Sequence, residues 1–215
     1  MKIRTFTSGV FGENAYLVRC AAGEWVAIDP GAEAEAMARE LEASGEPLRA
    51  ILLTHAHLDH MEGVADLVDH VPAPIHLHPA DRPLYDAAPQ QAAMFGHPFR
   101  APPAPDEALA HGQELRFGDR VLEVRHAPGH SPGHVLFHDA AAGVAFVGDV
   151  VFRGSIGRTD LPGGDSRQLL ASIREQVLSL PDETVLYTGH GDPTTVERER
   201  TTNPFLAPSF GGGLA

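Results

Sequence analysis

Three histidines and one aspartate lie within the short run Thr-His-Ala-His-Leu-Asp-His, which begins at Thr54 and ends at His60. Neutral imidazoles and carboxylates are the groups that bind zinc and similar divalent ions in proteins. Without a metal, a fold that buried so many polar groups would have to give each of them a hydrogen-bonding partner. The run therefore predicts a metal site, and any fold of this chain must bring further ligands to it.

The sequence on either side places this run between a strand and a helix. Residues 49–54 form a short, mostly apolar run of the kind found in buried strands. Downstream, apolar residues recur at helical spacing at Leu58, Met61, Val64, Ala65, Leu67 and Val68. Proteins of the α/β class commonly carry functional residues at such strand ends. His55 and His57 can then reach one ion while Asp59 and His60 turn toward a second.

Three more candidate donors stand at the ends of predicted strands farther along the chain. His130 follows the strand-like residues 121–125, and Asp149 and His190 each follow an apolar run that ends in glycine. Glycine lets the backbone come close to a bound ion. One histidine at a strand end is usually structural, but donors at four strand ends together indicate a metal centre.

This ordered set of donors resembles the metallo-β-lactamase superfamily, whose pattern is H-x-H-x-D-H followed by His, Asp and His. The resemblance implies an α/β fold, the αββα four-layer sandwich, in which two facing mixed β-sheets are flanked by helices and the metals lie at one edge. The implied ligands are His55, His57 and His130 for one ion, Asp59, His60 and His190 for the second, and Asp149 as the bridge. His134 is then expected behind the ligands or in a strand.

Two further segments narrow the resemblance to one branch of the superfamily. Residues 149–165 and the closing Asn-Pro-Phe-Leu at 203–206 look like the glyoxalase II-like, or hydroxyacylglutathione hydrolase-like, enzymes of the small single-domain bacterial type. The similarity runs from about residue 3 to residue 206. It predicts a single domain over residues 1–208 and a flexible tail at 209–215.

The resemblance implies a metal-dependent hydrolase that cleaves a thioester such as S-lactoylglutathione. Two divalent ions lower the pKa of a shared water, so a metal-bridging hydroxide would attack the carbonyl, and Asp59 would orient it. Metal charge would stabilise the oxyanion that forms. We expect two zinc ions, with iron or manganese as alternatives, because His and carboxylate donors accept all three.

Arg158 is the candidate substrate-binding residue. Glyoxalase II enzymes carry a basic residue nine positions after the bridging aspartate, where it holds the glutathione carboxylate, and Arg158 occupies that position here. The alternative interpretation, equally well supported, is that Arg158 forms an ion pair with Asp160 or Asp165. Two-domain members also carry an aromatic residue where this chain has Asp192, and a C-terminal helical domain where only twenty-five residues follow His190. A broader or different thioester substrate is therefore an alternative to a glutathione conjugate.

Two other activities stay open at this stage. A persulfide dioxygenase shares the Arg-Gly-x-x-Gly-Arg-Thr-Asp segment and would hold one iron at His55, His130 and Asp149. Its pattern has Ala-His-Asp where this chain has Gly-His-Gly at 189–191, and a cysteine where this chain has His134, which favours the dinuclear hydrolase. A lactonase or another ester or amide hydrolase would use the same metal chemistry. A purely binding module would be expected to have lost ligands.

Charge and composition limit the classes of partner that this chain can bind. Sixteen basic and twenty-nine acidic residues give a net charge of -13, which argues against a nucleic-acid surface. No apolar run approaches the roughly 20 residues that span a bilayer, and no leader precedes residue 1, so we expect a cytoplasmic protein with no membrane partner. The single Cys20 suits a reducing compartment and is expected to be half-buried in a strand. Oligomeric state is not indicated.

The remaining elements follow from local patterns. Strands are predicted at residues 3–7, 15–19, 25–29 and 74–78, and helices at 32–44 and 168–180. His76 and His78 are expected to be surface or packing residues. Residues 81–105 are rich in Pro and Ala and show neither the helical nor the strand periodicity of apolar residues. They are predicted to form either a loop with a short helix overhanging the site or a mobile surface insertion.

Overall fold

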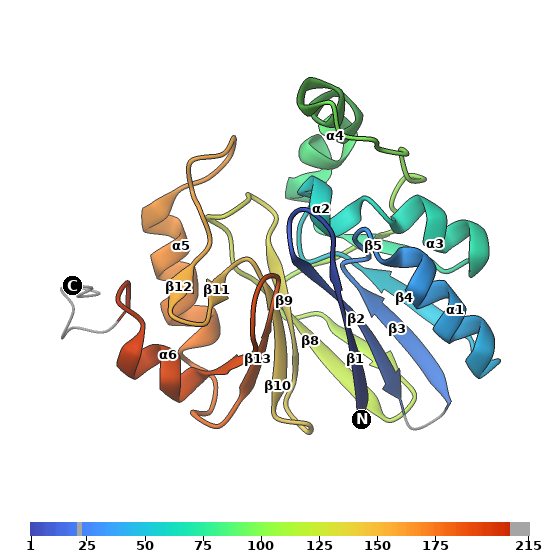
Figure 1. Ribbon diagram of the computed structural model, residues 1–215. Helices are drawn as coiled ribbons and strands as arrows, with labels where there is room; N and C mark the ends of the chain where they lie inside the picture. The colour runs from blue at the N-terminus through green and yellow to red at the C-terminus, as the bar shows by residue number, and fades with distance from the viewer. Residues whose placement is uncertain (21–22, 207–215) are drawn as a thin grey trace.

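The computed structural model describes residues 1–20 and 23–206, and the tail predicted at 209–215 lies outside them. Two six-stranded sheets face each other, and helices cover both outer faces (Figure 1). The predicted four-layer sandwich with two mixed sheets is confirmed. No helix within the described ranges is long and apolar enough to cross a membrane.

The first sheet comes from the N-terminal half of the chain. Its strands, in spatial order, are β1 (Lys2–Ser8), β2 (Glu13–Cys20), β3 (Glu24–Ile28), β4 (Leu48–Leu52), β5 (Ile75–Leu77) and β6 (Glu107–Ala108). Pairing is antiparallel from β1 to β3 and parallel from β3 to β6. Side chains alternate between the two faces, so Leu17 and Trp25 pack with helix α1 (Ala34–Ser44) while Val18 and Val26 face the second sheet.

The second sheet comes from the C-terminal half. Its strands, in spatial order, are β14 (Thr194–Thr195), β13 (Val185–Thr188), β10 (Val144–Gly148), β9 (Val135–Asp139), β8 (Arg120–His126) and β7 (Glu114–Phe117). Helices α5 (Ser166–Ser172) and α6 (Val196–Thr202) and the π-helical turn Ile173–Val177 cover its outer face. A short hairpin of β11 (Val151–Phe152) and β12 (Ser155–Ile156) follows β10.

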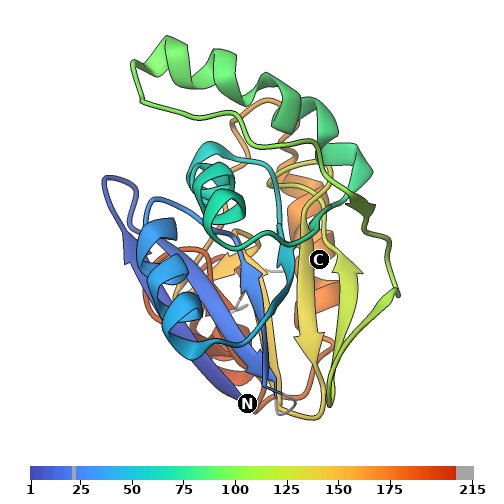
Figure 2. The ribbon, with the colours of Figure 1, turned by 90° about the vertical axis from the view of Figure 1, so that its right-hand side faces the viewer.

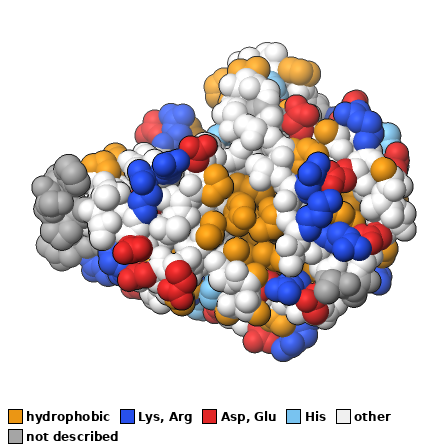
Figure 3. Space-filling view, turned by 60° about the horizontal axis from the view of Figure 1, so that its bottom comes forward, with side chains coloured by type: hydrophobic (Ala, Val, Ile, Leu, Met, Phe, Trp, Pro, Cys, Tyr) orange, Lys and Arg blue, Asp and Glu red, His pale blue; other side chains and the backbone are white. Residues whose placement is uncertain are grey.

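The apolar core between the sheets reaches the end of the sandwich that lies at the bottom of Figure 1. Ile3, Val185 and Tyr187 pack against this core while keeping part of their surface exposed. Figure 3, in which that end comes forward, shows hydrophobic side chains in the middle of the face with charged groups around them. The metal-ligand loops are at the opposite end, so this face plays no part in the site described below.

The helix predicted after the histidine run is interrupted. It consists of α2 (Leu58–Met61) and α3 (Val64–His70), separated at Glu62 and Gly63. A side chain at Gly63 would lie 2.0 Å from the carbonyl oxygen of Gly31, and the Gly63 amide donates to the carbonyl of Pro30. The backbone of this break therefore packs directly on the loop that follows β3, which no local pattern in the sequence indicates.

The segment at 81–105 contains a helix, as the first of the two sequence interpretations expected, but the helix is longer than predicted. This helix, α4 (Arg82–Phe95), has 14 residues and is preceded by a single 3₁₀ turn at Pro79–Asp81. Only Tyr85, Ala88 and Ala92 are buried, which leaves a narrow apolar stripe and explains the weak periodicity. Figures 1 and 2 show α4 standing above the edge of the sandwich, and in Figure 1 it lies above α2.

Candidate metal centre

The predicted ligands meet at one end of the sandwich, although they come from four separate loops. His55, His57 and His130 form one group and Asp59, His60 and His190 another, and within each group the ligand atoms lie within 4.8 Å of one another. Asp149 lies between the groups, with Oδ2 3.5 Å from Nε2 of both His130 and His190. Its other oxygen, Oδ1, is 3.3 Å from His60 Nε2. His76 and His78 lie in and after β5, outside both groups.

In the first group, three ring nitrogens point at one another. His57 Nδ1 is 2.8 Å from His130 Nε2, which is 3.2 Å from His55 Nε2. The other nitrogen of His130, Nδ1, donates a hydrogen bond to the carbonyl of Arg158 at 2.8 Å. Such a bond selects the tautomer in which Nε2 carries the lone pair, which is the arrangement found behind metal-binding histidines. The first group therefore fits a divalent ion.

Between Asp149 and the second group, two buried polar atoms lack a hydrogen bond. His60 Nε2 and Asp149 Oδ1 are fully enclosed and lie 3.3 Å apart, and neither has a hydrogen-bond partner among the described residues. A buried polar atom without a partner is costly, and a cation between imidazole and carboxylate would satisfy both. His190 Nδ1 donates to the carbonyl of Phe11 at 3.2 Å, so its Nε2 faces the carboxylates. The donor set thus fits a second divalent ion.

The pKa values of His57, in the first group, and His190, in the second, are shifted in opposite directions. Burial, together with the neighbouring His130, lowers the pKa of His57 to about 4, so this imidazole is neutral and able to bind a metal at neutral pH. Burial also lowers the pKa of His190, but its hydrogen bonds with Asp149 and Asp59 outweigh burial and raise the pKa to about 10. The carboxylates around His190 therefore favour a positive charge there, which a proton or a metal ion can supply.

Asp29 braces the first ligand loop, a role that sequence reasoning did not assign. One of its oxygens accepts from the backbone amide of Thr54 at 2.7 Å, and the other accepts from Thr54 Oγ1 at 2.6 Å and from His60 Nδ1 at 3.0 Å. Asp29 also has a positive φ of 48°, unusual for a residue other than glycine. It fixes both the strand end and the ring of His60.

Asp81 connects the first and second ligand loops. Its Oδ2 accepts from the amide of Ala56 at 3.0 Å and from Ser131 Oγ at 2.7 Å, and its Oδ1 accepts from the amide of Gly133 at 2.5 Å. Ala56 lies between His55 and His57, and Ser131 follows His130. A single aspartate ahead of a helix resembles an ordinary cap in sequence, so only the folded chain reveals this connection.

His134 lies behind the ligands, as the family pattern implies. Its Nε2 accepts a hydrogen bond from the backbone amide of Asp149 at 3.0 Å. Its ring is stacked on that of His55, with centroids 4.7 Å apart. His134 therefore holds one ligand loop against another. Cys20, expected to be half-buried, is fully buried at the end of β2.

The side chain of Arg158 is paired with a neighbouring carboxylate at the surface. Its guanidinium donates to both oxygens of Asp160, at 2.7 and 2.8 Å, and 60% of the side chain is exposed. Of the two ion pairs that the sequence allowed, the one with Asp160 is formed, while Asp165 caps α5 by accepting from the Gln168 amide. Arg158 lines a surface cavity of about 410 Å³ together with Ile156, Gly157, Thr159, Asp160, Ser166, Leu170 and Phe205.

Comparisons with known proteins agree with this geometry. The family model of the metallo-beta-lactamase superfamily matches residues 8–190. The hydroxyacylglutathione hydrolase GloC of Haemophilus influenzae is 38% identical over 96% of this chain and 98% of its own length. Among solved structures, BLEG-1 B3 metallo-beta-lactamase is 39% identical with a TM-score of 0.88, covering 95% of this chain and 99% of its own. TTHA1623 in a di-iron-bound form is 46% identical with a TM-score of 0.86, covering 94% and 100%.

Proposed function

The chain belongs to the metallo-beta-lactamase superfamily, and from that premise we propose that it is a dinuclear metal-dependent hydrolase that cleaves thioesters such as S-lactoylglutathione. The observation that carries the proposal is the pair of ligand groups that share Asp149. The similarity to a hydroxyacylglutathione hydrolase over nearly the whole chain supports the thioester as the substrate class.

The proposed ligands fall into two sets joined by Asp149. His55, His57 and His130 hold one ion, and Asp59, His60 and His190 hold the other. When bound, two such ions lower the pKa of a shared water toward about 7 and polarise the substrate carbonyl. We expect zinc, with iron or manganese as alternatives. The di-iron-bound form of TTHA1623 supports iron among these alternatives.

Asp59 has a second proposed role beside ligation. Its Oδ2 lies 3.3 Å from His190 Nε2 and 3.9 Å from His60 Nε2, so the carboxylate is held at the edge of the second group. Its side chain keeps 18% of its surface exposed, unlike that of His60. A partly exposed carboxylate can accept a hydrogen bond from the attacking water and orient this water toward the substrate carbonyl.

Arg158 is the proposed contact for a substrate carboxylate. The ion pair with Asp160 is on the surface, and exposed pairs of this kind contribute little to stability, so exchange for a substrate carboxylate is easy. The cavity beside Arg158 offers room for such a group. A glutathione conjugate, which carries carboxylates, fits this arrangement.

Two alternatives have different support. Hydrolysis of a β-lactam, lactone or other ester is a second candidate, because the chain is 39% identical to a B3 metallo-beta-lactamase over most of both chains. A persulfide dioxygenase with a single iron would use His55, His130 and Asp149 and leave Asp59, His60 and His190 without a role. The completeness of that second group favours the dinuclear hydrolase.

Metal analysis of the purified protein, paired with an assay of thiol release from S-lactoylglutathione, tests the proposal. We expect about two ions per chain and turnover that a chelator abolishes. A single iron, no thiol release and oxygen uptake with glutathione persulfide would replace the hydrolase with the dioxygenase. Release of product from a β-lactam or lactone, without thioester cleavage, would instead move the assignment to the second candidate.

A further inference from the structure

Large apolar side chains are exposed on two segments that meet at the ring contact between Phe11 and His97. Val10 and Phe11, in the loop between β1 and β2, are 91% and 47% exposed. Met94 and Phe95, at the end of α4, are 84% and 77% exposed. Exposed apolar groups that gather in one place mark a binding surface more often than isolated ones do. We call these four side chains the apolar rim.

The β1–β2 loop is fastened to the metal centre. The carbonyl of Phe11 accepts the hydrogen bond from His190 Nδ1 at 3.2 Å, and the amide of Asn14 donates to the carbonyl of Gly189 at 2.8 Å. The loop tip is enclosed by Gly9 and Gly12, both at positive φ. Val10 and Phe11 are therefore held next to a proposed ligand, and their exposure is not that of a distant loop.

The end of α4 is joined to the same loop through His97. The ring of His97 meets that of Phe11 edge-on, with centroids 5.5 Å apart, and its Nε2 bonds to the carboxylate of Glu62, directly after α2. The His97 amide donates to the carbonyl of Ala92 in the last turn of α4. The polar groups of this junction thus bond to one another, and the side chains left for a ligand are apolar.

The apolar rim and Arg158 are connected to different ligand groups through backbone hydrogen bonds. The carbonyl of Arg158 holds His130, which belongs to the first group, and the carbonyl of Phe11 holds His190, which belongs to the second. Figure 1 shows α4 and the segment at 157–165 rising on different sides of the sandwich edge. A substrate that lies across both groups therefore has one end toward Arg158 and the other toward the apolar rim.

We propose that the apolar rim binds a hydrophobic acyl group, so that the substrates of this protein are thioesters with acyl chains longer and less polar than lactoyl. This inference rests on the proposed thioesterase function, in which Arg158 contacts the thiol part. Burial of each methylene against an apolar wall strengthens binding, whereas the polar lactoyl hydroxyl gains nothing there. A chain with a net charge of -13 is poorly suited to an anionic membrane surface as the alternative occupant.

Calorimetric titration of the metal-loaded protein with two thioethers that it cannot hydrolyse, S-methylglutathione and S-hexylglutathione, tests this inference apart from catalysis. We expect the hexyl compound to bind about tenfold more tightly, because part of its chain lies on the apolar rim. Phe11→Ser and Phe95→Ser should bring the two dissociation constants together by weakening the hexyl compound alone. Phe11→Leu and Phe95→Leu, which keep an apolar side chain at the same positions, should preserve most of the difference.

Three results would overturn the inference. Equal affinity of both thioethers for the unaltered protein would mean that no hydrophobic acyl site exists. A preference for the hexyl compound that survives both serine variants would place the apolar contact elsewhere. Equal weakening of both compounds by the serine variants would mean that Phe11 and Phe95 do not distinguish the acyl group, and would exclude them from an acyl site. Thiol release from S-lactoylglutathione, measured in parallel, decides the proposed function independently of these outcomes.

Discussion

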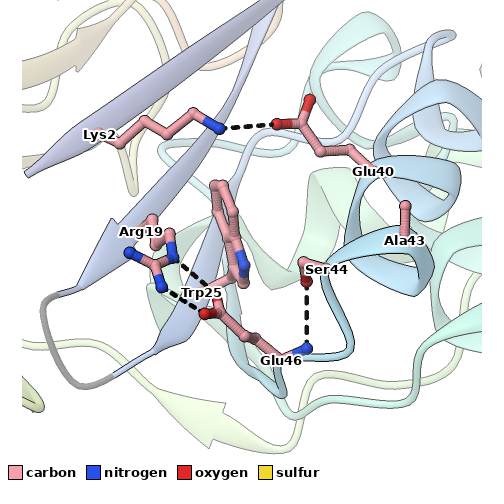
Figure 4. A pocket seen from close by; sticks show the side chains of 7 residues that line it. All are labelled: Lys2, Arg19, Trp25, Glu40, Ala43, Ser44 and Glu46. Carbon is pink, nitrogen blue, oxygen red and sulfur yellow. Dashed lines mark hydrogen bonds and ion pairs between the residues drawn. The ribbon is translucent and has the colours of Figure 1, made fainter.

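Polar and charged side chains gather at the metal centre and in a pocket on the outer face of the first sheet, and these two regions differ in how their charges are balanced. The metal centre buries imidazoles beside carboxylates, and His60 Nε2 and Asp149 Oδ1 lack hydrogen bonds within the described residues. The outer pocket, of about 380 Å³, carries both signs of charge (Figure 4). In it Lys2 pairs with Glu40 at 3.4 Å, and Arg19 pairs with Glu46.

This difference lies in how the charged groups of each region find partners. The outer pocket lies over Trp25, which Figure 4 shows between the two ion pairs, and its charges are satisfied by each other at the surface. The metal centre instead buries imidazoles and carboxylates whose charges are balanced only when a proton or a metal ion is bound among them. This requirement separates a site prepared for a ligand from an ordinary surface pocket.

Removing the shared carboxylate should have the largest effect. We expect Asp149→Ala to lower thioester hydrolysis by about a thousandfold or more, because both ions lose a ligand and the local charge that retains them. Elemental analysis should show fewer than two ions per chain. Full activity with two bound ions would refute the ligand assignment. The matched change in the outer pocket, Glu46→Ala, should leave metal content and turnover unchanged.

Loss of the brace between the ligand loops should have the next largest effect. We expect Asp81→Ala to weaken metal binding by about tenfold to a hundredfold, since the loops that carry His57 and His130 lose their common acceptor. Competition with a chelator of known affinity measures this change. Ser131→Ala removes one of the three bonds and should have a smaller effect. An unchanged metal affinity in Asp81→Ala would show that the loops hold their positions without it.

The pH dependence of the metal-free protein sharpens the contrast in charge. His190 has a folded-state pKa of about 10, above its ordinary value of 6.5, so the folded chain binds this proton more tightly than the unfolded chain does. The resulting stability is fully present below pH 6.5 and is lost as pH rises toward about 10. We expect the Tm of the chelated protein to fall by a few degrees across this range. His190→Gln should make the fall shallower, and an identical profile would contradict the assignment.

The smallest effect should come from the outer pocket. Glu40→Gln removes the negative charge that faces Lys2 and Arg4, and because these ion pairs lie at the surface we expect little change in Tm. Raising the ionic strength should likewise affect this region little, since screening acts on pairs that already contribute little. If Glu40→Gln markedly lowered turnover or metal content, the outer pocket would be coupled to the metal centre and the comparison between the two regions would fail.

The family resemblance carried by the metal-ligand motif predicted the four-layer sandwich, and short apolar runs and helical stripes, which are local signals, predicted most strands and helices. The sequence also identified all the donors that the structure brings into the two ligand groups. What it missed depends on contacts between distant residues. Asp29 acts on Thr54, and Asp81 acts on Gly133, across many intervening positions. The length of α4 was missed because only one narrow stripe of that helix is buried.

The order and type of residues already indicate the metal-binding chemistry of this protein, because imidazole and carboxylate side chains at strand ends are suited to divalent ions. The packing of the folded chain then determines which side chains surround those donors. It pairs Arg158 with Asp160, connects two ligand loops through Asp81, and holds Phe11 beside His190. Such contacts join residues that the chain keeps far apart, and they form only when the packing of two complete sheets brings their loops to one edge.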